Sequence, residues 1–78
     1  MTTREQVLEI LKEVKPTKDL ESVLDIVEGG YIDSFELMLL ITTLGERFGV
    51  EISIDDIVPE NFNSVDAMAR MIDTLTAK

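Results

Sequence analysis

Three stretches of the chain carry hydrophobic residues at the spacing of an amphipathic helix. Positions i, i+3, i+4 and i+7 share one face of an α-helix, so this spacing predicts a helix with one buried side. The first stretch starts at Thr3, a capping residue with Gln6 three positions later. Pro16 ends it, because a proline drives the preceding residue out of helical geometry. The apolar stripe of this stretch is Val7, Ile10, Leu11 and Val14.

The second stretch predicts the strongest helix. It opens at Asp33-Ser34, and Gly49 follows it as a typical residue at the end of a helix. At about 100° per residue, the stripe centres on Leu37, Leu44 and Phe48. Its members are Leu37, Leu40, Ile41, Leu44 and Phe48.

The third stretch begins near Asn63-Ser64, two residues that commonly cap helices. Before it, residues 55–58 predict one helical turn that Pro59 ends. The three central methionines, Met38, Met68 and Met71, are interpreted as flexible core filler. The stripe of the third stretch is Val65, Met68, Ile72 and Leu75.

These elements predict an all-α fold, a small four-helix bundle of three main helices and one short helix. Residues 16–33 form a long first loop, and a loop of this length in so small a chain is often functional. The alternating residues 51–54 are too few, without a partner strand, to make a sheet. At 78 residues, the chain is expected to form a single domain over residues 1–78.

Composition narrows the chemistry. The chain has no cysteine and no histidine, which excludes disulfides, thiolate or imidazole metal sites and Ser-His-Asp nucleophiles. We therefore expect no catalytic residues, no metal site and no enzymatic activity. No apolar run is long enough to span a membrane, and the sequence begins with amphipathic residues. These features predict a cytoplasmic protein.

The net charge of −9 is unevenly distributed. Residues 19–69 hold twelve acidic residues and one basic residue, a local charge of −11, whereas the two ends together carry +2. Such a charge argues against binding nucleic acid through its phosphates. It is consistent either with docking to basic partner surfaces or with a merely solubilising face.

Ser34 is the residue most suggestive of chemistry. It lies at the start of a predicted helix, after the flexible Gly29-Gly30 pair and next to Asp33. The N-terminus of a helix offers unpaired N–H groups and the positive end of the helix dipole, which favour a phosphate. The same residues also fit a simple helix cap, and the dipeptide alone does not distinguish the two.

The surrounding sequence resembles the acyl carrier protein family over essentially the whole chain. The resemblance rests on residues 30–38 (GYIDSFELM), on residues 45–50 (GERFGV), and on the order of helices and loops around them. It implies that Ser34 carries a 4′-phosphopantetheine arm derived from coenzyme A, with Asp33 as its flanking acid. The thiol of that arm would hold an acyl or aminoacyl group as a thioester, in pathways such as lipid or polyketide biosynthesis.

Two departures bear on the cargo. Fatty-acid carriers have glycine three positions before the serine and leucine after it, whereas this chain has Tyr31 and Phe35 there. The pattern is more similar to D-alanine carriers and to discrete carriers of specialised pathways. A D-alanine-type carrier is therefore the alternative within the family. A non-covalent helical interaction module, with Ser34 only a cap, is the alternative of another class.

The resemblance also implies partners. These are a phosphopantetheinyl transferase and the enzymes that activate and transfer the acyl or aminoacyl group, with the carrier itself a monomer. Leu39 falls about 200° from Leu37 on the second helix, on the outer side beside Phe35. We expect these two residues to form an apolar patch for partners. The predicted partner-binding residues are Phe35, Glu36, Leu39, Glu46, Asp55 and Asp56.

Overall fold

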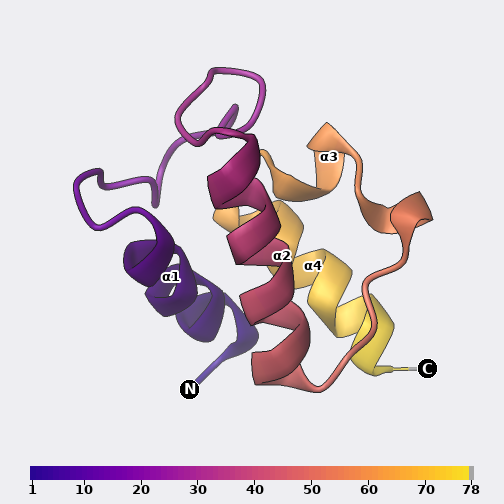
Figure 1. The fold of residues 1–78 in the computed structure, drawn as a ribbon. Coiled ribbons are helices and arrows are strands. Elements are labelled where there is room, and N and C mark those ends of the chain that lie inside the picture. The colour runs from indigo at the N-terminus through magenta and orange to yellow at the C-terminus, as the bar shows by residue number, and fades with distance from the viewer. Residues whose placement is uncertain (78) are drawn as a thin grey trace.

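The computed structural model describes residues 1–77 and shows three long helices and one short one (Figure 1). Helix α1 packs against both α2 and α4, and α3 packs against α4. No strand occurs in residues 1–77, so the predicted all-α four-helix fold is confirmed. The helices are α1 (Thr3–Val14), α2 (Ser34–Phe48), α3 (Pro59–Phe62) and α4 (Val65–Thr76), with a 3-10 helix, η1 (Ile54–Asp56), before α3.

The cap of α1 lies one residue earlier than predicted. Thr2 is extended and its hydroxyl accepts a hydrogen bond from the Glu5 N–H, while the Glu5 carboxylate accepts one from the Thr2 N–H. The predicted pair of Thr3 and Gln6 was wrong because Thr3 already has helical geometry and cannot fold back onto the first turn. The Thr2 backbone N–H and then its hydroxyl lower the pKa of Glu5.

Helix α2 begins and ends where the sequence predicted. Asp33 is its N-cap and Gly49, in the left-handed conformation, is its C-cap. The buried part of the stripe is its middle, where the rest of the core covers the helix. The outer members Leu37 and Phe48 pack against the core but are only half-buried. The buried members are Leu40, Ile41 and Leu44.

The short helix differs from the prediction. Pro59 does not end a helical turn but starts α3, while the preceding turn is the 3-10 helix η1. Proline is favoured at the first helical position because its missing N–H would have no partner there. The residue before it, Val58, is extended, as a residue before proline prefers.

A single hydrophobic core joins the helices and the long loop. Phe62 is the buried residue of α3, and Ser64 caps α4 as predicted, with its hydroxyl accepting a hydrogen bond from the Ala67 N–H. Three residues of the long loop, Leu20, Ile26 and Ile32, are also buried. The loop is therefore part of the folded core and not a free connection.

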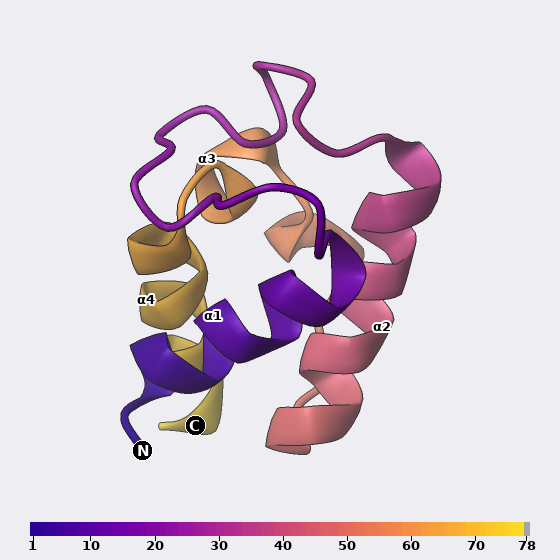
Figure 2. The same ribbon diagram turned by 90° about the vertical axis from the view of Figure 1, so that its left-hand side faces the viewer.

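The arrangement places the long loop, the start of α2 and α3 at one end of the molecule (Figures 1 and 2). Both ends of the described chain lie at the opposite end in both views. None of the helices within residues 1–77 is long and apolar enough to cross a membrane.

Candidate functional site

Ser34 is exposed at the first position of α2. The residue that caps the helix is Asp33: its carboxylate accepts a hydrogen bond from the Glu36 N–H at 2.8 Å. Within residues 1–77 the Ser34 hydroxyl makes no hydrogen bond. Asp33 thus performs the capping that the sequence allowed for either residue. The Ser34 hydroxyl remains available for chemistry.

Glu36 has two structural contacts near Ser34, one with Asp33 and one with Lys15. Its carboxylate accepts a hydrogen bond from the Asp33 N–H at 2.9 Å, completing a capping box. The Lys15 ammonium, at the end of α1, donates to both oxygens of the same carboxylate, at 2.9 and 3.2 Å. The Asp33 backbone N–H and then Lys15 lower the pKa of Glu36. Glu36 thereby links the first turn of α2 to α1.

A shallow depression lies beside Ser34. It has a volume of about 260 Å³ and includes half-buried Val27 and Leu37 as well as the serine. A smaller apolar cavity of about 70 Å³ adjoins the depression, and Val27 and Leu37 line both of them. The other residues of the smaller cavity are Ile57, Val58, Pro59 and Phe62.

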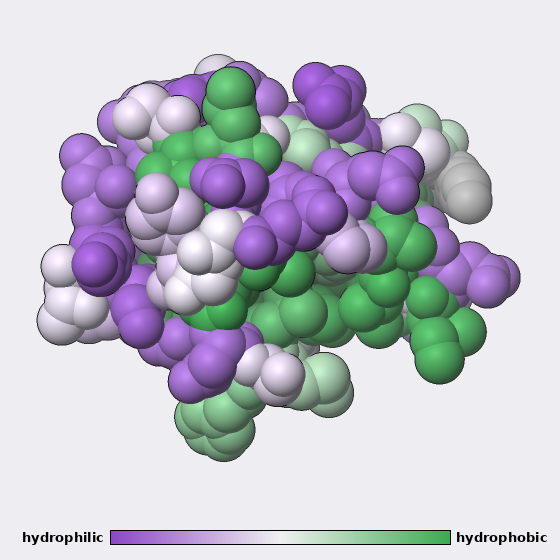
Figure 3. Space-filling model, turned by 90° about the horizontal axis from the view of Figure 1, so that it is seen from above, coloured by the Kyte–Doolittle hydropathy of each residue, from purple (hydrophilic) through white to green (hydrophobic). Residues whose placement is uncertain are grey.

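Three large apolar side chains project from the first two turns of α2. Phe35 is 76% exposed, Met38 60% and Leu39 44%. Their spacing of three and four residues places them side by side on the helix surface. Seen from the end of the molecule that carries the long loop, hydrophobic surface interrupts the hydrophilic surroundings (Figure 3). The predicted outward position of Leu39 beside Phe35 is confirmed.

Met38 was misinterpreted as core filler, although Met68 and Met71 are buried as predicted. The helical spacing contained the signal: Met38 lies about 100° from the centre of the apolar stripe, too far around the helix to be covered. Glu36 lies about 100° to the other side, toward Lys15, the C-cap of α1. The interpretation as core filler relied on the apolar character of methionine and not on its position on the helix.

The predicted acidic partner residues do not form one cluster. Glu46 is exposed on α2, about two turns beyond Leu39, whereas Asp55 is exposed on η1. The carboxylate of Asp56 accepts hydrogen bonds from the backbone N–H and the hydroxyl of Ser53. The structure therefore brings Phe35 and Leu39 together with Met38 on α2, and it distributes the acids over α2 and η1.

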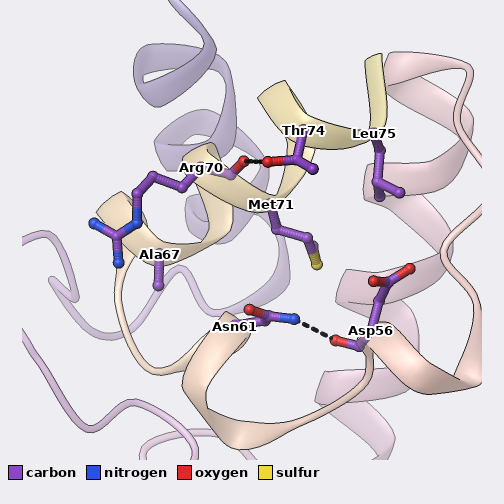
Figure 4. A pocket seen from close by; sticks show the side chains of 7 residues that line it. All are labelled: Asp56, Asn61, Ala67, Arg70, Met71, Thr74 and Leu75. Carbon is purple, nitrogen blue, oxygen red and sulfur yellow. Dashed lines mark hydrogen bonds between the residues drawn. The ribbon is translucent and has the colours of Figure 1, made fainter. Parts of the chain in front are cut away.

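Another cavity lies away from Ser34, between α4 and residues 56–61 (Figure 4). Asn61 donates to the Asp56 carbonyl at 2.8 Å there, and Thr74 donates to the Arg70 carbonyl at 2.9 Å. These are local helix and turn contacts without an activated nucleophile. No group of three or more acidic side chains suited to a metal occurs within the described part of the chain.

Comparison with known proteins gives a consistent result. Residues 4–72 match the family model described as the phosphopantetheine attachment site. A D-alanyl carrier protein of Bacillus cereus (strain B4264) is 40% identical over 55 residues, which cover 68% of this chain and 70% of that protein. A D-alanyl carrier protein of Bacillus anthracis (strain CDC 684 / NRRL 3495) matches with the same identity and coverage.

Proposed function

The chain belongs to the phosphopantetheine-attachment family of carrier proteins, and from this premise we propose that Ser34 is the residue that takes the arm. Such a carrier holds an acyl or aminoacyl group as a thioester on 4′-phosphopantetheine. The observation that carries the assignment is that Asp33, not Ser34, caps α2. Helix capping therefore does not account for the presence of an exposed serine at position 34.

The surroundings of Ser34 fit a phosphodiester. The first turn of α2 presents the positive end of a 15-residue helix, which stabilises a negative charge there. The Asp33 carboxylate already accepts the Glu36 N–H, and Lys15 offsets the charge of Glu36. The bound arm supplies a thiol for the thioester, and the depression beside Ser34 gives its root a surface to lie on.

Attachment exchanges the phosphoanhydride bond of coenzyme A for a phosphate ester bond to the protein. The Ser34 oxygen bonds to the phosphorus of the pantetheine phosphate of coenzyme A, the bond to the adenosine 3′,5′-bisphosphate breaks, and that group leaves. The serine proton passes to a base of the transferase, since the neighbouring carboxylate on this chain, Asp33, is already engaged with the Glu36 N–H. We propose that the chain itself catalyses neither this step nor the loading of its cargo.

The direct test is the mass of the intact protein. The wild-type chain incubated with coenzyme A, magnesium and a broad-specificity phosphopantetheinyl transferase should gain one arm, and Ser34→Ala should gain none. Ser53→Ala is the matched control, since Ser53 is an exposed serine that precedes η1, and it should be modified like wild type. Attachment to Ser34→Ala, or none to wild type, would contradict the assignment.

For the cargo we propose an aminoacyl group of the D-alanine type. The likeness to D-alanyl carrier proteins supports this choice. The small apolar cavity beside Ser34, about 70 Å³, is a second argument, since it is about the volume of two water molecules. A long acyl chain would have to displace close-packed core residues to enter. The arm-bearing protein should accept D-alanine from a D-alanine-activating enzyme faster than a long-chain acyl group from an acyl-activating one.

We further propose that partners contact the apolar patch, defined as Phe35, Met38 and Leu39. Exposed apolar side chains close to an attachment point suit partners that must bind and release quickly, because a few such residues carry most of the binding energy. The exposed acids Glu46 and Asp55 would add charge at the margin of the contact. Glu36, held by Lys15, and Asp56, held by Ser53, are less available to a partner.

A further inference from the structure

Asn63 makes an unusual set of hydrogen bonds to the long loop. Its side-chain oxygen accepts from the backbone N–H groups of Val27 and Glu28, at 3.1 Å each. Its side-chain nitrogen donates to the Glu28 carboxylate at 2.6 Å. Its backbone carbonyl accepts from the Ile26 N–H at 2.9 Å. One residue thus satisfies three successive N–H groups of a segment that is 35 or more positions away in the sequence.

Asn63 also lies where two helices meet. It is the C-cap of α3 and directly precedes Ser64, the N-cap of α4. A helix of four residues is too short to be stable by itself. The position of α3 therefore depends on buried Phe62 and on the contacts at its ends.

The segment held by Asn63 forms a tight turn, residues 25–31, which leads directly into the site. The Gly29 N–H donates to the Asp25 carbonyl at 2.6 Å, and the Tyr31 N–H donates to the Ile26 carbonyl at 3.0 Å. A side chain at position 29 would lie 2.6 Å from that Asp25 carbonyl oxygen, so only glycine fits. This turn sets the direction from which the chain enters Ile32, Asp33 and Ser34.

The turn also forms one wall of the surface beside the serine. Val27, whose N–H Asn63 accepts, lines both the depression next to Ser34 and the smaller cavity under α3. The opposite wall of the smaller cavity includes Pro59 and Phe62 of α3. Asn63 therefore connects the turn to the end of α3 through hydrogen bonds.

We propose that Asn63 is a positioning residue for reactions at Ser34. It holds the turn of residues 25–31 against the α3–α4 junction, so that a partner enzyme meets the turn, the start of α2 and α3 in one arrangement. A surface ordered before binding saves the partner the cost of ordering it. The proposal rests on the assignment of Ser34 as the attachment residue.

Four variants separate positioning from general stability. Asn63→Ala removes the side-chain contacts to Val27 and Glu28. Asn63→Asp keeps the acceptor but sets a carboxylate against that of Glu28. Adding Glu28→Gln to Asn63→Asp restores the contact with donor and acceptor exchanged. Asn61→Ala is the matched control, because Asn61 hydrogen-bonds the Asp56 carbonyl and not the turn.

Two measurements decide the proposal. Amide hydrogen exchange of Val27 and Glu28 reports the turn directly and requires no activity. Steady-state kinetics of arm attachment by a broad-specificity transferase reports the effect on partners. For Asn63→Ala, we expect amide exchange about tenfold or more faster and a KM for the carrier about fivefold or more higher, as the loss of the three side-chain hydrogen bonds of Asn63 predicts. The kcat should stay within about twofold, because the partner supplies the chemical step.

Asn63→Asp keeps the acceptor but loses the donor, so its amide exchange and KM should lie between those of Asn63→Ala and wild type. The Asn63→Asp/Glu28→Gln pair and Asn61→Ala should behave like wild type. Unchanged attachment kinetics in Asn63→Ala, despite faster exchange at Val27 and Glu28, would overturn the positioning role. Unchanged exchange would overturn the contact itself. If Asn63→Ala does not fold, the comparison of Asn63→Asp with Asn63→Asp/Glu28→Gln decides. A double variant that does not restore the KM of wild type counts against the proposal. Failure of wild type to take the arm would instead contradict the role of Ser34.

Discussion

At the scale of single residues, the Asp-Ser pair combines two tasks that one residue could not perform together. A serine that caps its own helix has its hydroxyl engaged with a backbone N–H. Here Asp33 takes that hydrogen bond, at 2.8 Å from the Glu36 nitrogen. Ser34, one position later, remains exposed at the positive end of the helix dipole.

This division predicts opposite effects at neighbouring positions. Asp33→Ala should destabilise the fold by about 1 kcal/mol, because it removes the N-cap of α2, and should lower the melting temperature by about 4–8 °C. Ser34→Ala should change stability by less than about 0.5 kcal/mol, as is typical for an exposed position without contacts. Thermal unfolding followed by circular dichroism measures both. A larger loss in Ser34→Ala than in Asp33→Ala would show that the cap is assigned to the wrong residue.

The apolar patch on α2 gives a second prediction at residue scale. Leu39→Glu should slow loading of the arm-bearing protein by its aminoacyl- or acyl-activating partner by about tenfold or more, as is typical when a central interface residue is lost. Attachment of the arm by a permissive transferase should continue. Thr42→Glu, exposed on the same side of α2 and one turn further on, adds the same charge outside the patch. If Leu39→Glu and wild type load at equal rates, the patch does not select partners.

At the scale of helices and loops, local sequence signals predicted most of the architecture. Spacing and capping residues predicted α2 between its caps Asp33 and Gly49, and the start of α4 near Asn63-Ser64, because those signals act within one or two turns. Pro59 was placed at the end of a helix although it begins one, because the residue types alone fit either position. The fold and the serine were therefore predictable locally.

Contacts between distant elements were not predictable in this way. Asn63 was interpreted as a helix cap, yet its side chain bonds to Val27 and Glu28. Glu36 was expected to face partners, yet it pairs with Lys15 at the end of α1. Both contacts depend on how the long loop and α1 pack, which no spacing within a single helix records.

The pair of Glu36 with Lys15 predicts a pH dependence of the link between α1 and α2. The pKa of Glu36 is lowered in the folded protein, chiefly by the Asp33 N–H and then by Lys15. The unfolded chain therefore binds the proton first as the pH falls. The stabilisation is present above 4.5, the ordinary pKa of a glutamate, and is lost as the pH falls below it.

Glu36→Gln should accordingly be less stable than wild type near pH 7, with the difference vanishing as the pH falls well below about 4.5. Glutamine can still complete the capping box, so the loss isolates the charge. Melting temperatures of both proteins between about pH 7 and pH 3 test this. Lys15→Gln should retain the larger part of the pH dependence, since the backbone N–H is the first cause. A difference independent of pH would contradict the prediction.

At the scale of the whole molecule, folding brings the basic ends of the chain onto its acidic middle. Arg4 pairs with both Glu21 and Asp66, at 3.2 and 2.7 Å. Arg47, in turn, pairs with Glu13 of α1 at 3.2 Å. These exposed pairs contribute little to stability. Their effect on the surface is larger: cations neutralise acids near α1 and α4, and none of these pairs involves Glu46 of α2 or Asp55 of η1.

This distribution predicts docking that depends on ionic strength. Association with a transferase or loading enzyme should slow as salt rises from about 0.01 M to 1 M, because the screening length falls from about 30 Å to about 3 Å. Asp55→Lys should reduce the association rate more than Glu9→Lys, which makes the same change of charge on the exposed side of α1. Stopped-flow mixing measures these rates. A rate unaffected by salt, or equal effects of the two reversals, would contradict directed docking.

The placement of the two ends of the chain has a practical consequence. Both ends of the described part, residues 1–77, lie opposite the long loop, the start of α2 and α3 (Figures 1 and 2). A tether, resin or fluorescent fusion joined to either end would therefore leave Ser34 and the apolar patch facing away from the support. An immobilised carrier could be armed, loaded and discharged by soluble enzymes in turn, and the same orientation would let several copies on one flexible scaffold serve partners without obstructing one another.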